Sequence, residues 1–512
     1  MDKPDKKKGS IFNRRQFLKV GGLAAFSAQA GGLIAAGKIA GSDQSTHSGW
    51  ESSNPKTQFF NRKPFEFTGP AFKPVDKVIR PSYMTDFVFK RIFLLKKAFK
   101  NNPSWKLSDP IEKLGLLPPL VKFYKTFPER LEWDYRTFKE TIPQNMKDME
   151  KYGNYYKLAD AYSQGFENHS ASLPRPQKPP EESDFEVSYF AGMGYKKRRI
   201  GKPVPFKSPE LAAKYIKEIA HRYGATLVGI TKTNPDFLYA EDWRGCPKDY
   251  DFSKLPTHWE YSIVIGVPME WDILQASPHF STSFDAYDRI STTAVRLEGA
   301  LKNLGYPART HSPMTEYDLI VPPIAIDAGL GELARTGYAI TPELGGNCRM
   351  AVVTTSLPMA TDKPIKFGVE QFCSKCKICA DSCPSGAISK ADSYDGMVIR
   401  GYEHWYINNG ACYNFWREAL GPIGCRLCIA VCPFSRKNNF IHKMAKDIDS
   451  RDPTGIANSA LIWMQKNFFE YPDAVEYRRK PLGRFATFRP APEFFNAENY
   501  LNIKIVDPSK GG

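Results

Sequence analysis

The C-terminal third of the chain is defined by CSKCKICADSCP, residues 373–384. The run places Cys376 and Cys379 at three-residue steps after Cys373, and Cys383 follows after three further residues, directly before a proline. This spacing is typical of bacterial ferredoxins, in which one loop gives three thiolates to a 4Fe-4S cube and the fourth cysteine reaches a second cube. We therefore predict a ferredoxin-like domain with two 4Fe-4S clusters.

A second cysteine set supports this interpretation. Cys412 is followed by Cys425-x2-Cys428-x3-Cys432-Pro433, with 12 residues between Cys412 and Cys425 where two are usual. The crossed ferredoxin pattern predicts that the first cluster is held by Cys373, Cys376, Cys379 and Cys432. The same pattern assigns the second cluster to Cys383, Cys425, Cys428 and, less regularly, Cys412.

Other roles for these cysteines fit the spacing less well. Structural zinc sites use pairs of cysteines separated by longer stretches, and three close cysteines before Cys-Pro suit one tetrahedral ion poorly. Disulfides between cysteines so close in sequence would be strained. Cys246 and Cys348 lie outside both sets, and we expect them to be structural.

The first forty residues read as a targeting segment. A lysine-rich start leads to Arg14-Arg15 and then to a Gly/Ala-rich apolar stretch. Paired arginines before a mildly apolar stretch look like a twin-arginine export signal, and the alternative is a basic disordered tail. No later segment has eighteen uninterrupted apolar residues, so we expect the mature chain to be soluble or peripheral.

The net charge of +16 could favour an anionic partner, such as nucleic acid or a membrane surface. The most basic run is Lys196-Lys197-Arg198-Arg199, beside a proline-rich stretch. No nucleic-acid motif accompanies it, so we interpret it as a solvated loop and expect no nucleic-acid partner.

Alternating helices and strands predict an α/β (α+β) domain upstream of the cysteines. Ser208-Pro209 is a helix start, Leu211, Tyr215, Ile219 and Tyr223 form one apolar face, and Gly224 ends the helix. We expect strands over 226–231 and 262–267 and a long helix over 285–304.

The predicted domain organisation has five parts. They are a signal peptide (1–40), an aromatic-rich N-terminal region with a linker (41–190), an α/β core (191–365), a two-cluster domain (366–445) and a C-terminal extension packing on the core (446–512).

Two clusters next to an α/β domain can deliver electrons to it one at a time. In a chain of this size we therefore expect the α/β domain to hold a redox cofactor. Aromatic residues make up 13% of the chain, which suits a pocket for a large planar cofactor and an apolar substrate. None of the eight histidines follows an aspartate by two residues, so the D-x-H-x-x-G motif that supplies a histidine beneath cobalt is absent.

Together these features resemble the corrinoid-dependent reductive dehalogenases of organohalide-respiring bacteria. The resemblance also includes Ile340-Thr341-Pro342-Glu343-Leu344-Gly345, Lys366-Phe367-Gly368-Val369 and Ala328-Gly329-Leu330-Gly331. It implies a nitroreductase-like corrinoid-binding core, with a ferredoxin-like domain near the C-terminus and a base-off, cobalamin-type corrinoid.

The resemblance also implies site residues. Tyr287, at the start of the expected long helix, matches the family's proton donor, and Arg349, shortly before the first cysteine set, matches its partner. A cation beside a phenol lowers the pKa of the phenol, which makes it a better acid. We expect Ser283, Gly329, Gly331, Gly345 and Trp416 to contact the corrinoid or line its pocket. The pocket asparagine of some members has no match between His311 and Asp318.

The implied activity is replacement of halogen by hydrogen on a small organohalide, by a Co(I) corrinoid that the two clusters reduce, as the terminal step of organohalide respiration. The implied partners are a small membrane-anchor protein and an upstream electron donor. The implied location is the periplasm or the outer face of the cytoplasmic membrane. Two alternatives are an enzyme like epoxyqueuosine reductase and an electron-transfer subunit that carries only clusters.

Overall fold

The computed structural model describes residues 65–510, except for gaps at 83, 175–179, 193, 241–254, 316, 396–400, 420, 422–423, 437–439, 451, 453, 475–476 and 478–486. The predicted signal peptide (1–40) and Cys246 therefore lie outside the described residues.

A four-stranded sheet forms the centre of the core. Every neighbouring pair of strands is antiparallel, in the spatial order β4 (Leu227–Lys232), β5 (Tyr261–Pro268), β9 (Cys348–Thr355) and β6 (Ala308–His311). The mixed helix and sheet composition confirms the predicted fold class, and the antiparallel order makes it α+β rather than α/β.

Helices cover both faces of this sheet. Because side chains alternate along a strand, Ile263 and Ile265 of β5 pack with α9 (Pro209–Arg222) and α11 (Phe284–Asn303), whereas Val264 packs with α12 (Val321–Asp327). The strand is buried along almost its whole length. The buried sheet therefore fixes the position of α11, including its first turn.

The predicted start of α9 is confirmed, and its predicted apolar face is half right, because Ile219 and Tyr223 pack against the core whereas Leu211 and Tyr215 do not. The Ser208 side chain accepts a hydrogen bond from the Leu211 amide at 3.3 Å, as an N-cap should. Leu211 and Tyr215, however, are 47% and 44% exposed. The face that packs on the sheet is instead lined mainly by small residues, namely Ala212, Ala213, Ile216 and Ala220.

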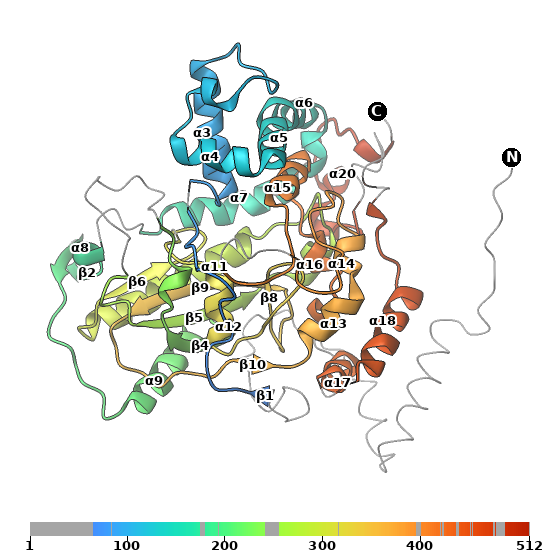
Figure 1. Ribbon diagram of the computed structural model, residues 1–512. Helices are drawn as coiled ribbons and strands as arrows, with labels where there is room; N and C mark the ends of the chain where they lie inside the picture. Colours follow the sequence, from blue (N-terminus) through green and yellow to red (C-terminus); the bar gives the residue numbers. More distant parts are fainter. Residues whose placement is uncertain are drawn as a thin grey trace, which may run out of the picture.

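The N-terminal helices lie above the core, and α15 of the cysteine-rich segment inserts beneath them (Figure 1). The contact is polar, because the Asn414 side chain on α15 accepts hydrogen bonds from Thr137 and Thr141 at 3.0 and 2.7 Å. The helices involved are α3 (Val88–Asn101), α4 (Pro118–Thr126), α5 (Pro128–Arg136), α6 (Ile142–Tyr152), α7 (Lys157–Ala171) and α15 (Asn409–Glu418).

The cysteine-bearing helices stand beside the sheet, and two C-terminal helices pack outside them (Figure 1). They are short, as expected for segments that place thiols around a cluster. Besides α15, which carries Cys412, the cysteine-bearing helices are α13 (Val369–Cys376), α14 (Ile378–Asp381) and α16 (Leu427–Ala430). The two C-terminal helices are α17 (Phe440–Asp449) and α18 (Ile456–Phe468).

Shorter elements connect these layers. They are β1 (Phe65–Glu66) paired with β10 (Ile365–Lys366), β7 (Glu332–Leu333) paired with β8 (Ala339–Ile340), and the helices α8 (Pro180–Ser183), α10 (Trp271–Gln275) and α20 (Ala497–Tyr500). The hairpin of β2 (Glu186–Ala191) and β3 (Gly194–Arg199) includes the basic run 196–199, so the predicted loop is wrong and the run is strand.

Three predicted domain boundaries fall inside elements. The 190/191 boundary cuts β2, the 365/366 boundary cuts β10, and the 445/446 boundary cuts α17. The cysteine-rich segment is therefore tied into its surroundings rather than joined by free linkers. Of the helices that the structure describes, none is long and apolar enough to span a bilayer.

Candidate functional site

Polar side chains converge at the first turn of α11, where Ser283 is the residue that caps the helix and Tyr287 lies one turn further on. The Ser283 hydroxyl accepts hydrogen bonds from Arg349 at 2.8 and 3.2 Å. It also accepts one from Arg426 and donates to the sulfur of Met269 at 3.3 Å. The structure therefore brings together three residues predicted for the site, Ser283, Tyr287 and Arg349.

Tyr287 lies between two cations. The guanidinium of Arg349 is 5.3 Å from the centre of its ring, and that of Arg426 donates a hydrogen bond to its side chain. Burial raises the pKa of Tyr287, but the two arginines outweigh burial and hold this pKa below its ordinary value. A phenol in this setting gives up its proton more readily than a tyrosine in water.

Arg426 was not predicted from the sequence. Its side chain is 3% exposed, and it precedes α16 between Cys425 and Cys428. The cysteine spacing already accounted for this segment, so nothing in the local pattern marked the residue between the thiols. The only available signal was a long cation placed two residues or fewer from a cluster ligand. Because Arg426 donates a hydrogen bond to Tyr287, it connects the segment of the second cysteine set directly to this tyrosine.

Trp416 joins the same cluster through Arg426, whose guanidinium lies 5.6 Å from the centre of a Trp416 ring. The indole also meets Phe89 and Tyr413 edge-on, at 5.5 and 5.6 Å. A Cβ on Gly424 would lie 1.0 Å from the indole, so only glycine lets the ring lie there. The structure thus places Trp416 next to the site, and its role as a wall of the cofactor pocket stays a prediction.

Two further tyrosines lie near Tyr287 without having been predicted. Burial raises the pKa of Tyr317, and Tyr287 is the next neighbour that raises it. Partial burial raises the pKa of Tyr338, which is 39% exposed, and its charged neighbours are Cys428, Arg349, Cys412 and Tyr287. Tyr338 is therefore near both the second cysteine group and the Tyr287–Arg349 pair.

The three glycines predicted to contact a cofactor approach protein backbone instead. A Cβ on Gly329, Gly331 or Gly345 would lie 2.4, 2.2 or 2.0 Å from a carbonyl oxygen of Lys363, Ile340 or Phe434, respectively. Gly329 and Gly345 also have φ of +74° and +60°, which favours glycine. These contacts account for the glycines by themselves, and their role in cofactor binding stays a prediction.

The eight cysteines of the two sets are all free and fall into two neighbouring groups. Burial raises the pKa of Cys376 to about 12, and Cys432 is the thiol that adds to this. The surrounding protein raises the pKa of Cys412 to about 12 although this residue is exposed, and Cys383 adds to the shift. The partners of Cys376 and Cys412 come from different sequence sets, which is the crossed arrangement predicted from the spacing.

All eight thiols follow this division. In the first group, Cys373 has Cys432 and Cys376 as neighbours, and Cys379 has these three. In the second group, Cys425 and Cys428 both have Cys412 and Cys383 as neighbours. The two groups adjoin, because Cys428 also raises the pKa of Cys379, and Cys432 also raises that of Cys428. No three His, Cys, Asp or Glu side chains of the described residues are arranged to hold a single metal ion.

Two buried cations accompany the first group. Arg335 is 1% exposed and donates two hydrogen bonds, at 2.7 and 3.1 Å, to the backbone carbonyl of Cys373. Its guanidinium also lies 4.7 Å from the centre of the Trp405 ring. Lys446 donates to the carbonyl of Pro342 at 3.1 Å, and burial lowers the pKa of Lys446 to about 8. A fully loaded cluster with its four thiolates is an anion, so cations at this place favour its binding.

Fold and site therefore define an α+β core joined to a two-cluster iron–sulfur domain, with a phenol–arginine site between them. Residues 372–436 match the family model described as a 4Fe-4S dicluster domain. This match supports the predicted pair of 4Fe-4S clusters.

The chain is similar to known reductive dehalogenases in sequence and in fold. The tetrachloroethene reductive dehalogenase of Sulfurospirillum multivorans is 30% identical over 274 residues, which are 47% of this chain and 54% of that protein. The solved structure of the catabolic reductive dehalogenase NpRdhA superposes with a TM-score of 0.54 and 22% identity, covering 79% of this chain and 48% of that one. The fold is thus that of a reductive dehalogenase.

The chain spans about half the length of the curated reductive dehalogenases that it matches. The epoxyqueuosine reductase of Bacillus subtilis matches less of the chain, with 28% identity over 158 residues that cover 30% of this chain and 39% of that protein. The alternative based on that enzyme is therefore less well supported.

Proposed function

We propose that this protein is a reductive dehalogenase, which replaces a halogen by hydrogen on a small organohalide. One observation carries the proposal: Tyr287 lies between Arg349 of the core and Arg426 of the cysteine-rich segment. A plain electron carrier needs no activated phenol at the end of its clusters. An enzyme that must protonate a carbon as electrons arrive needs one there.

The donor set fits two 4Fe-4S clusters, because eight free thiols form two groups of four. When bound, the clusters supply single electrons. The first cluster is assigned to Cys373, Cys376, Cys379 and Cys432, and the second to Cys383, Cys412, Cys425 and Cys428. Arg426 follows Cys425 directly in the sequence and donates a hydrogen bond to Tyr287, which supports the second group as the inner end of the path.

The residues around Tyr287 also fit a polar macrocycle such as a corrinoid. Within the described part of the chain, Ser281 Oγ and Asn347 Oδ1 are buried without a hydrogen-bond partner. Ser281 lies two residues before Ser283, and Asn347 lies two residues before Arg349. Buried polar atoms normally have partners, so these two suit the amide side chains of a corrinoid. When bound, a corrinoid supplies the low-potential reductant that breaks the carbon–halogen bond. A solved reductive dehalogenase structure with the fold of this chain is described in terms of B12-dependent dehalogenation, which supports this choice of cofactor.

The chain itself supplies the proton. Tyr287 donates its hydroxyl proton to the substrate carbon as the carbon–halogen bond breaks, and the halide leaves with its bonding electrons. Arg349 and Arg426 stabilise the phenolate that remains. The Ser283 hydroxyl, which accepts from both arginines, keeps their side chains beside the ring. The balance is one proton and two electrons consumed, one C–H bond formed and one halide released.

An assay of halide release tests the proposal. Chain loaded anaerobically with clusters and corrinoid is given reduced viologen and a panel of chlorinated and brominated ethenes and phenols. We expect halide release that falls about 10²- to 10⁴-fold in Tyr287→Phe, the usual range for loss of a general acid. Undiminished release by the variant contradicts the role of Tyr287, and no release from any organohalide contradicts the activity.

The setting of the reaction is part of the proposal. The twin-arginine segment supports export of the folded, cofactor-loaded chain to the periplasm or the outer face of the cytoplasmic membrane. There it would complete organohalide respiration, attached through a small membrane-anchor protein and reduced by an upstream donor.

A further inference from the structure

The hairpin of β2 and β3 takes no part in the site, yet it has an unusual surface. Phe190 and Tyr195 near its turn are 65% and 81% exposed, and Tyr189 is 39% exposed. The four residues that follow Tyr195, the cations 196–199, are exposed as well. We call Tyr189, Phe190, Tyr195 and these four cations the hairpin surface.

The register of the hairpin groups these side chains. Phe190 faces Tyr195 across the strands, and their rings meet edge-on at 5.6 Å. Arg198 lies over the ring of Tyr189 on the other face, at 5.8 Å. The only carboxylate of the two strands, Glu186, is at their base, 4.0 Å from Lys197. The outer end is therefore aromatic, and the cations begin immediately behind it.

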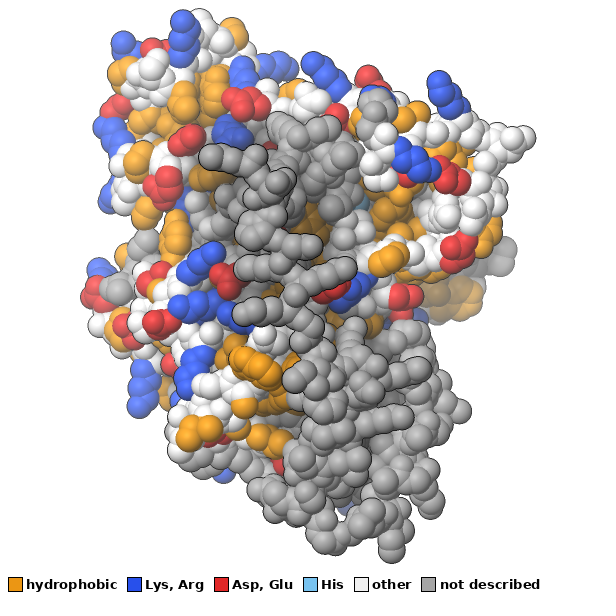
Figure 2. Space-filling model, turned by 90° about the vertical axis from the view of Figure 1, so that its right-hand side faces the viewer, with side chains coloured by type: hydrophobic (Ala, Val, Ile, Leu, Met, Phe, Trp, Pro, Cys, Tyr) orange, Lys and Arg blue, Asp and Glu red, His pale blue; other side chains and the backbone are white. Residues whose placement is uncertain are grey.

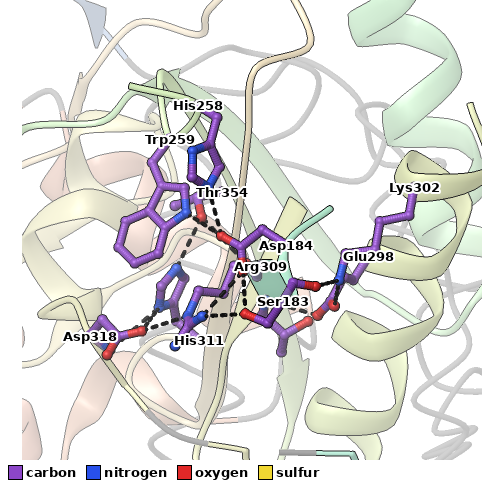
Figure 3. Close-up of polar contacts among 11 residues, drawn as sticks. Ser183, Asp184, His258, Trp259, Glu298, Lys302, Arg309, His311, Asp318 and Thr354 are labelled. Carbon is purple, nitrogen blue, oxygen red and sulfur yellow. Dashed lines mark hydrogen bonds and ion pairs between the residues drawn. The ribbon is translucent and has the colours of Figure 1, made fainter. Parts of the chain in front are cut away.

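A buried polar network holds the base of the hairpin (Figure 3). Asp184, two residues before β2, accepts from Arg309 at 3.1 Å and from Trp259 and His258 at 2.7 and 2.8 Å. Arg309 also donates to Asp318 at 2.8 Å. The amide just after β3 donates to the carbonyl of residue 185 at 2.9 Å. Both ends of the hairpin are thus fixed to the core, and β2 lies at the edge of the molecule (Figure 1).

The charges of the hairpin are arranged differently from those on the face shown in Figure 2. On the face shown in Figure 2, lysines and arginines are interspersed with aspartates and glutamates. On the hairpin, four consecutive cations face a single carboxylate. This is a local positive field, which attracts an anionic surface.

We propose that the hairpin surface docks on an anionic phospholipid bilayer. A strand rises about 3.3 Å per residue, so Lys197 lies roughly 7 Å behind Tyr195. Rings inserted to the usual interfacial depth of about 5–10 Å thus bring the cations to the level of the lipid phosphates. Tyrosine rings favour this boundary because one end is apolar and the other is polar. The projection of the rings favours a bilayer over an acidic protein, which would need a pocket for them.

Vesicle co-sedimentation tests the proposal on the full chain loaded with its clusters. The vesicles are phosphatidylcholine alone, or phosphatidylcholine with about a third phosphatidylglycerol. We expect binding to the anionic vesicles only. Lys196→Gln/Lys197→Gln should weaken it about thirtyfold, because each cation contributes about fivefold at an anionic surface. Phe190→Ser should weaken it roughly tenfold through lost ring insertion. Unchanged circular dichroism would show that both variants fold.

The matched control is Lys147→Gln/Lys504→Gln, which removes the same charge from two exposed lysines away from the hairpin. It should bind like the unmodified chain. Hydrogen exchange localises the contact, because anionic vesicles should protect the amides of residues 186–199. Equal weakening in the control, or protection confined to other segments such as the basic N-terminus, would overturn the proposal. So would a hairpin variant that loses only its binding to a membrane protein and keeps its affinity for vesicles. None of these outcomes depends on the dehalogenase activity.

Discussion

Replacing Arg349 by methionine tests how the structure activates Tyr287. The guanidinium lies 5.3 Å from the ring centre, and at an effective dielectric constant of about 20 its attraction for the phenolate is about 3 kcal/mol. In the transition state only part of the negative charge on the Tyr287 oxygen has developed, so only part of this energy affects the rate. Since each 1.36 kcal/mol corresponds to about tenfold in rate, Arg349→Met should slow halide release by roughly 10- to 200-fold.

The pH profile separates this effect from a merely structural one. Tyr287 must carry its proton to act, so activity falls as the pH rises through the pKa of Tyr287. Arg349 lowers that pKa, and its removal should therefore move the alkaline limb of kcat to higher pH. Arg349→Lys, which keeps the cation, should leave the limb near its original position. Ser283→Ala controls for the lost hydrogen bond. A slower Arg349→Met enzyme with an unchanged alkaline limb would refute the electrostatic role.

Three other variants test the remaining parts of the structure. Cys432→Ala should remove the first cluster and Cys383→Ala the second, and each variant should lower the iron content from about eight atoms to about four. The crossed assignment fails if electron paramagnetic resonance shows that each variant loses the cluster of its own sequence set. Arg309→Met leaves two buried aspartates without their cation, so it should lower the free energy of unfolding by about 3–5 kcal/mol in a urea titration, and a loss below 1 kcal/mol would contradict this. Burial raises the pKa of Asp449 to about 8, so this group favours folding at acid pH and the benefit is lost as the pH rises from about 4 to 8. Asp449→Asn should therefore flatten the pH dependence of the melting temperature in that range and stabilise the protein at pH 8, and an unchanged profile would contradict it.

Local sequence signals predicted the framework well where one element carried a complete pattern. The helix expected over 285–304 is α11, Phe284–Asn303, because its start, its apolar repeat and its terminal glycine all lie within one segment. The cysteine spacing likewise predicted which thiols come together. The pairing of Tyr287 with Arg349 came from a family resemblance, because nothing local links residues on different elements.

The failures share a physical reason, which is that they depend on long-range packing. On α9 the face that packs on the sheet includes Ala212 and Ala220, whose small side chains allow close approach, rather than Leu211 and Tyr215. The hairpin of β2 and β3 has exposed side chains on both faces, so it lacks the alternation that identifies a strand. Arg426 acts across the chain, on Ser283 more than a hundred residues away, and a spacing motif contains no such information.

The most direct test of the central claim is the metal content of chain purified without oxygen and loaded with corrinoid. Two cysteine groups that supply electrons to a corrinoid beside Tyr287 require about eight iron atoms, as much sulfide, and about one cobalt per chain. Iron and sulfide without cobalt would leave a plain electron carrier, and zinc in place of iron would contradict the account altogether.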